Sequence, residues 1–386
     1  MKRTGKLIAV LLFLIFMTHV SVLAADKAAF RTDPKTNTGK KWRIGYYEGG
    51  EYAFYQYNLV AMVQGLMDLG WIEKVKIPKQ RGDQTRAFWN WLSTRAKSRY
   101  IRFVKNAHYS HSWNSDLREK TANELIGRLT ETKDIDLVIA AGTRAGQDLA
   151  NNKHETPTIV ISASDPVGSG IIQSIENSGH DHIHARVDPY RYERQIQVFY
   201  DSLGFKTLGI AYEDTDRGRT STSFQKVEIA SKQLGFRMIP CSIIDEYPDA
   251  GVSERSILKC FDYFVKNKAD AIYVTAQNGV NSNSISDLVE IANSNGIPTF
   301  SQTGSENVKY GFLMSTSSSD FKQVGLFYAK TAAKIFNGAK PRELDQLFEA
   351  PPEIAINLKT AKLIGYDPPV DILGAADELF EDIEKP

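Results

Sequence analysis

The sequence has only two cysteines among its 386 residues, Cys241 and Cys260. So few cysteines exclude a fold stabilised mainly by disulfides, and no Cys/His spacing is typical of a zinc site. Cys241 follows a predicted strand at 236–239 and Pro240, and Cys260 lies on a predicted helix at 253–266. A strand and the helix after it pack together, so the two thiols could form a bridge or could remain two buried thiols.

The motifs of several large enzyme classes are also missing. No GxGxxG follows the first predicted strand, and neither GxxxxGK[ST] nor GxSxG occurs. Phosphate-cradling loops and the nucleophile elbow of acyl transfer therefore have no support. Since no pair of residues suggests catalysis, we expect neither an enzyme nor a bound cofactor.

No excess of charge of one sign is present, with 47 Lys and Arg against 46 Asp and Glu. Loss of Lys2, Arg3 and Lys6 with an N-terminal leader would leave 47 − 3 = 44 basic residues against 46 acidic ones, a charge of about −2. No block of basic residues is apparent, so we do not expect a nucleic-acid partner.

Long hydrophobic runs are absent apart from residues 7–17. That run follows three basic residues and leads to Ala24 and Ala25, which predicts a cleaved signal peptide over 1–25. A membrane anchor is the alternative, but a bilayer span needs about 20 apolar residues. No cysteine follows the run, so we expect no lipid anchor and a protein exported in soluble form.

What the sequence does contain is a regular alternation of strands and helices. Apolar runs without alternation indicate parallel strands buried on both faces, and helical spacing of apolar residues fills the gaps between them. The pattern runs once before residue 185 and again after it, which predicts an α/β protein of two Rossmann-like lobes with parallel sheets. The predicted strands are 42–47, 101–104, 135–140, 157–161, 207–212, 236–239, 269–274, 297–300 and 310–314. The predicted helices are 57–69, 117–129, 145–150, 190–203, 223–234, 253–266, 285–292 and 321–336.

Four blocks of sequence resemble one known family, the periplasmic substrate-binding components of ABC transporters that include tryptophan- and phenylalanine-binding members. They are the strand and Gly-Thr turn at 136–143, the Ser-Asp-Pro-Val-Gly-Ser-Gly turn within 156–170, the segments 269–274 and 295–300, and the tail at 354–362.

The resemblance implies a type I periplasmic binding fold with a three-strand hinge. Lobe one would comprise 42–185 plus 309–341, and lobe two 186–308 plus 342–386. It also implies a periplasmic monomer that closes on a small-molecule ligand and delivers it to an inner-membrane ABC permease.

The chain departs from the family pattern in three places. The usual Asp-Asn pair, suited to a ligand ammonium, is replaced by Gln277 and Asn278. The usual crossover is replaced by a stretch containing His180, His182 and His184. Three imidazoles at strand spacing could bind a metal, but a crossover favours solvated histidines, and we expect no metal.

The third departure is an inserted segment at 72–100. If this segment is helical, Phe88, Trp91 and Leu92 share one face and Trp89 points elsewhere. Its aromatic residues could face a partner or could pack on lobe one.

Candidate ligand-binding residues follow the carboxyl ends of the predicted strands, where open α/β sheets bind ligands. The first turn offers tyrosine rings and a glycine that lets backbone approach a ligand. Thr143 could cap its helix or, with nearby amides, receive an anionic end of the ligand. Arg144 could contact the ligand or face solvent. Asp165 could contact ligand or only brace its turn, and Asp214 or Glu213 could replace the missing ammonium partner. The complete set is Tyr47, Glu48, Gly49, Tyr52, Gly142, Thr143, Arg144, Ser164, Asp165, Tyr212, Asp214, Gln277, Asn278 and Gln302.

We therefore expect a binding protein for a small aromatic or heterocyclic, amino-acid-like solute. A sensory module that presents its closed form to a membrane receptor is the alternative, motivated by the aromatic residues of the insertion.

Overall fold

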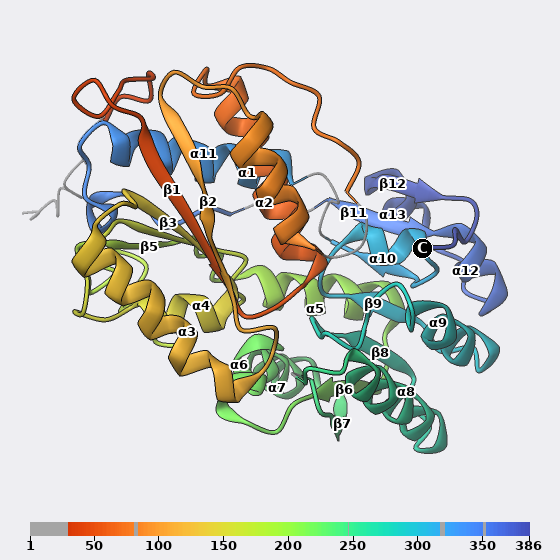
Figure 1. Cartoon of the computed structure of the whole chain (residues 1–386). Helices are drawn as coiled ribbons and strands as arrows, with labels where there is room; N and C mark the ends of the chain where they lie inside the picture. Colours follow the sequence, from red (N-terminus) through yellow and green to blue (C-terminus); the bar gives the residue numbers. More distant parts are fainter. Residues whose placement is uncertain (1–29, 81–83, 246, 317–320, 350–352) are drawn as a thin grey trace, which may run out of the picture.

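Two mainly parallel sheets, each covered by helices on both faces, form two lobes (Figure 1). The computed structural model describes residues 30–80, 84–245, 247–316, 321–349 and 353–386. The predicted signal peptide at 1–25 lies outside the described residues. Both sheets follow the alternating pattern of the sequence, which confirms the predicted α/β fold with two Rossmann-like lobes.

Lobe one is built on a five-stranded, all-parallel sheet. Helices α1, α2 and α11 cover one face, and α3, α4 and a short π-helix, η1, cover the other. In sheet order the strands are β2 (Ile101–Ser110), β1 (Trp42–Glu48), β3 (Leu137–Ala141), β4 (Thr158–Ile161) and β5 (Ile183–Ala185). The helices are α1 (Ala53–Asp68), α2 (Thr85–Arg95), α3 (Ser115–Gly127), η1 (Arg128–Thr132), α4 (Gly142–Leu149) and α11 (Lys322–Phe336).

Lobe two is built on a seven-stranded sheet that is parallel except for the β10–β11 pair. In sheet order its strands are β12 (Ala376–Phe380), β11 (Ile354–Asn357), β10 (Met314–Ser315), β9 (Thr299–Ser301), β8 (Ala271–Val274), β6 (Thr207–Tyr212) and β7 (Arg237–Ser242). Its helices are α5 (Arg191–Leu203), α6 (Asp216–Ser221), α7 (Phe224–Leu234), α8 (Ala250–Lys266), α9 (Ile285–Ser294), α10 (Ser305–Lys309), α12 (Leu358–Leu363) and α13 (Val370–Ala375). The short 3-10 helix η2 (Pro341–Glu343) instead lies against β5 of lobe one.

The chain crosses between the lobes after β5, between β10 and α11, and between α11 and β11. Two crossings run side by side, because Val187 donates to Gln346 O at 2.7 Å and accepts from Phe348 N at 3.0 Å. One predicted boundary is wrong: residues 309–341 were assigned to lobe one, but β10 is a strand of the second sheet. The strand predicted at 310–314 is shorter in the structure, because β10 comprises Met314 and Ser315 alone.

The inserted segment forms α2, which packs on lobe one, so the packing alternative for its aromatic residues is confirmed, but Trp89 does not point away from the packed side. Trp89 is fully buried, and its Nε1 donates to Val104 O of β2 at 2.9 Å. Phe88 and Leu92 are buried, and the half-buried Trp91 stacks on Phe88, which agrees with the shared face predicted for these three residues. The helix therefore turns Trp89, not Trp91, into the core.

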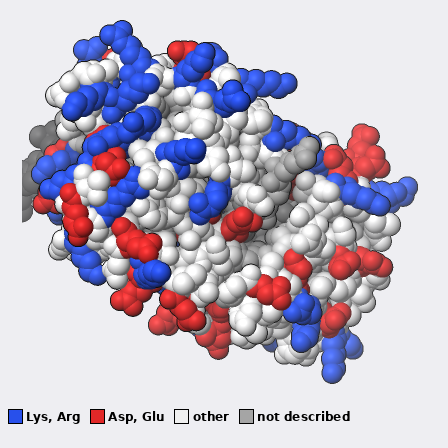
Figure 2. Space-filling view, viewed as in Figure 1, with Lys and Arg blue, Asp and Glu red and all other residues white. Residues whose placement is uncertain are grey.

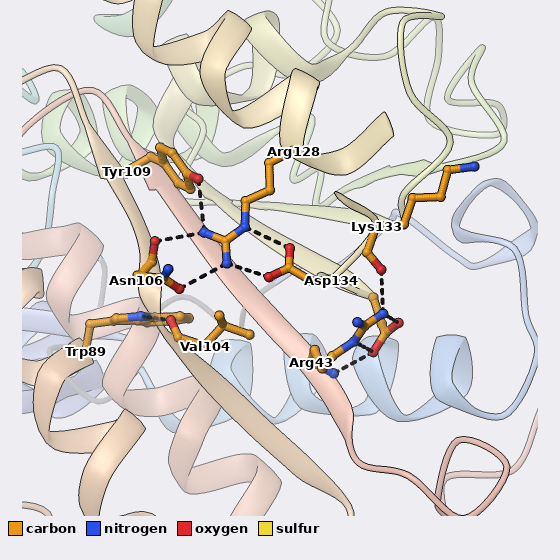
Figure 3. A network of polar contacts seen from close by, with 9 residues as sticks. Arg43, Trp89, Val104, Asn106, Tyr109, Arg128, Lys133 and Asp134 are labelled. Carbon is orange, nitrogen blue, oxygen red and sulfur yellow. Dashed lines mark hydrogen bonds and ion pairs between the residues drawn. The ribbon is translucent and has the colours of Figure 1, made fainter. Parts of the chain in front are cut away.

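The outer edge of lobe one is fixed by a polar network around Arg128 (Figure 3). The guanidinium donates to both carboxylate oxygens of Asp134, at 2.8 and 2.7 Å, and to Asn106 and Tyr109 of β2. The hydrogen bonds from Arg128 hold the pKa of Asp134 below its usual range. This network ties edge strand β2 to η1 and to the start of β3.

In lobe two, Cys241 and Cys260 form a disulfide with their Cα atoms 5.7 Å apart. The bridge joins β7 to α8, so the bridged alternative is confirmed. Pro240 does not end the strand as expected but lies within β7. A proline is tolerated there because β7 is an edge strand.

Candidate functional site

A cavity of about 150 Å³ lies between the lobes, at the carboxyl ends of β4 and β9 and beside the crossings. Lobe one contributes the turns after β1 and β4, and lobe two contributes α5 and the turns after β8 and β9. The crossings supply Arg186, Asp188, Thr316 and Phe348. A cavity formed by both lobes and the crossings can change shape when the lobes move.

Aromatic side chains form much of the cavity wall: Tyr52, Phe54, Tyr192, Phe321 and Phe348. Phe54 contacts both Tyr52 and Phe321, with ring centroids 5.4 and 5.9 Å apart. Such rings bury flat apolar area, and the two tyrosines add a polar tip. The wall is therefore suited to a planar, largely apolar group.

Charged side chains from the start of α5 and the preceding crossing also reach the cavity. Arg194 donates to both oxygens of Asp188, at 2.8 and 2.9 Å, which neutralises that carboxylate. Arg191 donates to Gln302 O at 3.1 Å. The Arg186 guanidinium lies 5.9 Å from the centre of the Phe348 ring and forms no hydrogen bond or ion pair with a described residue.

Backbone strain marks the turn after β4. Ser162 lines the cavity with a φ of +57°, a conformation that costs a non-glycine residue energy. Its neighbour Ser164 accepts a hydrogen bond at 3.2 Å from the Tyr192 hydroxyl of lobe two. The strained turn thus places lobe-one backbone directly against lobe two.

Of the predicted ligand-binding residues, Tyr52, Ser164 and Gln302 line the cavity. The side chain of Gln302 is held on both ends, since its Oε1 accepts from Ala276 N and its Nε2 donates to Thr222 O. Its fixed amide therefore shapes the wall of the cavity.

Tyr47, Glu48 and Gly49 lie below the surface of the cleft and outside this cavity. Tyr47 is fully buried, and its hydroxyl donates to Asp148 at 2.6 Å. Gly49 lies under the Trp113 ring, where a Cβ atom would come within 2.7 Å of the ring. The glycine is needed for close packing with an aromatic side chain of its own lobe.

Glu48 belongs to a buried polar cluster with Tyr46, Thr85 and His108. Its Oε2 accepts from Tyr46 at 2.9 Å and from Thr85 at 2.7 Å. Burial raises the pKa of Glu48 to about 8 and lowers the pKa of His108 to about 3. Although these two side chains are 3.9 Å apart, both are neutral near pH 6 and form no ion pair.

Gly142, Thr143 and Arg144 form the first turn of α4, outside the lining of the cavity. Gly142 has a φ of +86°, and its missing side chain leaves room for the Tyr55 hydroxyl. Arg144 is buried, so the solvent-facing alternative for it is wrong. The predicted role of Thr143 at an anionic end of the ligand stays a prediction.

Asp165 braces its turn. Its Oδ1 accepts from Gly168 N at 2.8 Å and its backbone oxygen accepts from Ser169. This geometry matches the bracing alternative, and Asp165 is not part of the cavity wall.

The predicted residues after β6 are engaged with arginines of α6. Asp214 is exposed and pairs with Arg219 at 2.7 Å, and Glu213 pairs with Arg217 at 2.8 Å. Tyr212 lies under the Arg219 guanidinium, 4.9 Å from its ring centre. Neither acid reaches the cavity as a partner for an ammonium group.

Gln277 and Asn278 also have partners inside lobe two. Gln277 is buried, and its Nε2 donates to Ala211 O at 2.6 Å. Asn278 N donates to Asp245 at 2.7 Å, and burial raises the pKa of that carboxyl to about 7. These residues stabilise the turn after β8 without lining the cavity.

The three histidines of the crossover do not converge. His184 lies in β5 and contacts Asp345 O at 2.9 Å, whereas His180 pairs with Asn152. His182 and His184 are buried, so the interpretation as solvated histidines is wrong for both. No cluster of metal-ligating side chains occurs within the described ranges.

Sequence reasoning missed Arg186, Arg191, Tyr192 and Phe348. A signal was present: residues 186–192 read Arg-Val-Asp-Pro-Tyr-Arg-Tyr, and this run of cationic and aromatic residues lies where the strand and helix pattern restarts. Phe348 carried no comparable signal.

Comparison with known proteins identifies one family. The profile of the family described as ABC transporter substrate binding protein matches residues 103–379. Proteins with curated descriptions include none that matches the chain.

Several solved structures share the fold. A conserved domain protein from Vibrio cholerae O1 biovar El Tor is 17% identical, with a TM-score of 0.67. An ABC domain in complex with L-Trp from Streptococcus pneumonia is 18% identical, also with a TM-score of 0.67. The ligand-free, open structure of a substrate binding protein with adhesive properties from Clostridium difficile is 18% identical, with a TM-score of 0.57. Each match covers 88% of this chain and 100% of the other. Every helix that the structure describes is too short or too polar to cross a membrane.

Proposed function

The chain belongs to the ABC transporter substrate-binding protein family, and we propose that it captures a small aromatic or heterocyclic, amino-acid-like solute for an ABC importer in the inner membrane. It would act in the periplasm, after removal of the signal peptide predicted at 1–25, as a monomer and without catalysis.

The cavity between the lobes carries this proposal. Its aromatic wall is suited to a planar ring, and Arg186 stacks over Phe348 at its edge. An arginine over an aromatic ring keeps its planar donors available, and these match a carboxylate in a bidentate geometry. A ring with a carboxylate is therefore the class of ligand that fits both features.

A second charged group suggests the rest of the ligand. Glu353 lines the cavity and forms no ion pair or hydrogen bond with the residues that the structure describes. Together with Arg186 it offers one negative and one positive charge, as a zwitterion requires. Glu353 thus replaces Asp214 and Glu213 as our proposed partner for an ammonium group.

The alternative function, a sensory module, has lost the observation that motivated it. Phe88 and Trp89 of α2 are buried in lobe one, so they form no exposed aromatic surface. We therefore keep transport as the proposal.

A thermal-shift screen tests the ligand class. The family relative crystallised with L-Trp makes L-Trp, L-Phe and indole carboxylates the first compounds to test. A ligand at 100 times its Kd stabilises the native state by about 2.7 kcal/mol. Stabilisation by sugars or inorganic ions, with none by any aromatic carboxylate, would contradict the proposal. Loss of uptake of the same labelled solute in cells lacking the gene tests delivery, and recovery of unchanged ligand tests the absence of catalysis.

A further inference from the structure

One end of lobe one carries a concentration of basic side chains. We call it the basic face and define it as Lys40, Lys41, Lys74, Lys76, Arg95, Lys97, Arg99 and Arg102. All eight are exposed, and none forms an ion pair with a described residue. Within the stretches 40–41, 73–76 and 95–102 that carry these residues, the one acid is Glu73. The chain as a whole has almost equal numbers of basic and acidic residues, so this excess is local.

The basic face is assembled from three stretches of the chain that lie side by side. Glu73 N donates to Lys97 O at 2.9 Å, which joins the stretch after α1 to the end of α2. Trp42 N donates to Tyr100 O at 2.7 Å, which brings Lys40 and Lys41 beside the same loop. Figure 2 shows Lys and Arg gathered over this upper part of lobe one, with few Asp or Glu between them. No run in the sequence predicts the face, because its members are spread from residue 40 to residue 102.

The position of the basic face separates it from ligand binding. It surrounds the amino ends of β1 and β2, whereas the cavity lies beyond the carboxyl ends of the strands. A partner that distinguishes the open from the closed protein must contact both lobes. The basic face belongs to lobe one alone, so it cannot report closure to an importer.

General roles of surface charge do not explain the face. Basic residues on an edge strand prevent aggregation between sheet edges. Of the eight residues of the basic face, however, Arg102 alone lies on edge strand β2. A surface with both positive and negative side chains keeps a protein soluble equally well, so solubility does not require charge of one sign here. A surface of one sign in a nearly neutral protein instead favours a fixed orientation against an anionic partner.

We propose that the basic face binds an anionic phospholipid surface and so holds lobe one against the membrane. Spread cationic side chains without a pocket suit mobile lipid headgroups better than the fixed shape of one protein or nucleic acid. Tyr100 is half-buried and Val75 is 39% exposed between the lysines. Aromatic and apolar groups beside basic ones are typical of surfaces that lie on a bilayer. The proposal goes beyond solute capture and does not depend on the ligand.

Vesicle flotation of the processed protein, with its first residue established by mass spectrometry, tests this inference. Vesicles of phosphatidylcholine with phosphatidylglycerol should bind the protein, and vesicles of phosphatidylcholine alone should not. Raising NaCl from about 0.05 to about 0.5 M should release it, since the Debye length shortens. Each basic residue near such a surface changes binding roughly fivefold.

Two matched variants locate the surface. Lys74→Glu, Lys97→Glu and Arg99→Glu together should lower vesicle binding by about a hundredfold or more. The control, Lys232→Glu, Lys259→Glu and Lys266→Glu, changes the net charge equally at exposed positions of lobe two and should leave binding within about threefold. Circular dichroism and thermal unfolding confirm that both variants fold. Equal loss in both variants, equal binding to neutral vesicles, or retention on DNA or an acidic protein without vesicle binding would overturn the proposal.

Discussion

The Tyr192 hydroxyl of lobe two donates a hydrogen bond of 3.2 Å to the backbone oxygen of Ser164 in lobe one. Both residues line the cavity, and Ser164 follows a strained turn that begins at Ser162. The bond therefore links the geometry of the cavity to the relative position of the lobes.

Replacing Tyr192 by Phe removes this bond and keeps the ring. A neutral hydrogen bond contributes about 1 kcal/mol, so affinity for the solute should fall about fivefold. Titration calorimetry measures the change, and small-angle scattering should report a larger radius of gyration in the absence of ligand. Tyr200→Phe, in the same helix, is the control. Unchanged affinity and radius in Tyr192→Phe would mean that the bond does not hold the lobes together.

Glu48→Gln should change how stability depends on pH. Burial raises the pKa of Glu48 to about 8 from an ordinary value of 4.5. The native state thus holds a proton that the unfolded state has lost over this range. The stability of the wild type should fall, relative to the variant, as pH rises from about 4.5 to about 8, by at most about 1.4 kcal/mol per pH unit.

Urea unfolding at pH 5 and pH 8 measures this difference for Glu48. Burial lowers the pKa of His108 from an ordinary 6.5 to about 3, so His108 makes stability rise with pH between these values. This contribution is shared by the wild type and Glu48→Gln, and it therefore cancels from the difference between them. The exposed Glu73→Gln is the control and should follow the wild type at both values. A Glu48→Gln protein that loses stability with pH as steeply as the wild type would show that this carboxyl is already ionised when folded.

The periodicity of apolar residues predicted most of the strands and helices, because the pattern of buried side chains along each segment reflects its secondary structure. The strand at 207–212 matches β6 at both ends, since its five buried residues form an uninterrupted run. Trp89 was misplaced because helical spacing alone cannot say which side of a helix meets the sheet. Its hydrogen bond to Val104, fifteen residues away in the chain, decides the orientation.

Removing the disulfide should destabilise lobe two. In the chain-entropy treatment, a bridge across 19 residues is worth about 3 kcal/mol. The variant Cys241→Ser, Cys260→Ala should unfold with its midpoint at a lower denaturant concentration. Reductant should lower the unfolding midpoint of the wild type to the same concentration. The variant itself should not respond to reductant. A wild-type midpoint that reductant leaves unchanged would contradict the prediction.

The candidate site was harder to predict than the fold, for a physical reason. Strand ends indicated where ligand contacts gather, and Tyr52, Ser164 and Gln302 do line the cavity. Side chains at the same ends, such as Tyr47 and Gln277, are instead satisfied by partners within their own lobes. Which polar group is left facing a cleft depends on contacts between distant segments.

Two positions compete for the negative end of the ligand, the first turn of α4 and Arg186, and the structure favours Arg186. The Tyr55 hydroxyl lies over Gly142 at the start of α4, and Thr143 does not line the cavity. Arg186 does line it, with its guanidinium beside the Phe348 ring. Losing a hydrogen bond to a charged group costs about 1.5–3 kcal/mol, so Arg186→Leu should weaken binding of the best aromatic carboxylate roughly ten- to hundredfold.

The same calorimetric titration separates the two positions. Thr143→Val keeps the side-chain shape and should bind within about twofold of the wild type, because its hydroxyl lies outside the cavity. Arg237→Leu, an exposed arginine on β7, controls for loss of a positive charge and should also bind normally. The uncharged amide of the same ligand should bind the wild type and Arg186→Leu equally, since neither can then form the ion pair. If Thr143→Val loses affinity and Arg186→Leu does not, the helix start holds the carboxylate and the cavity holds only the ring.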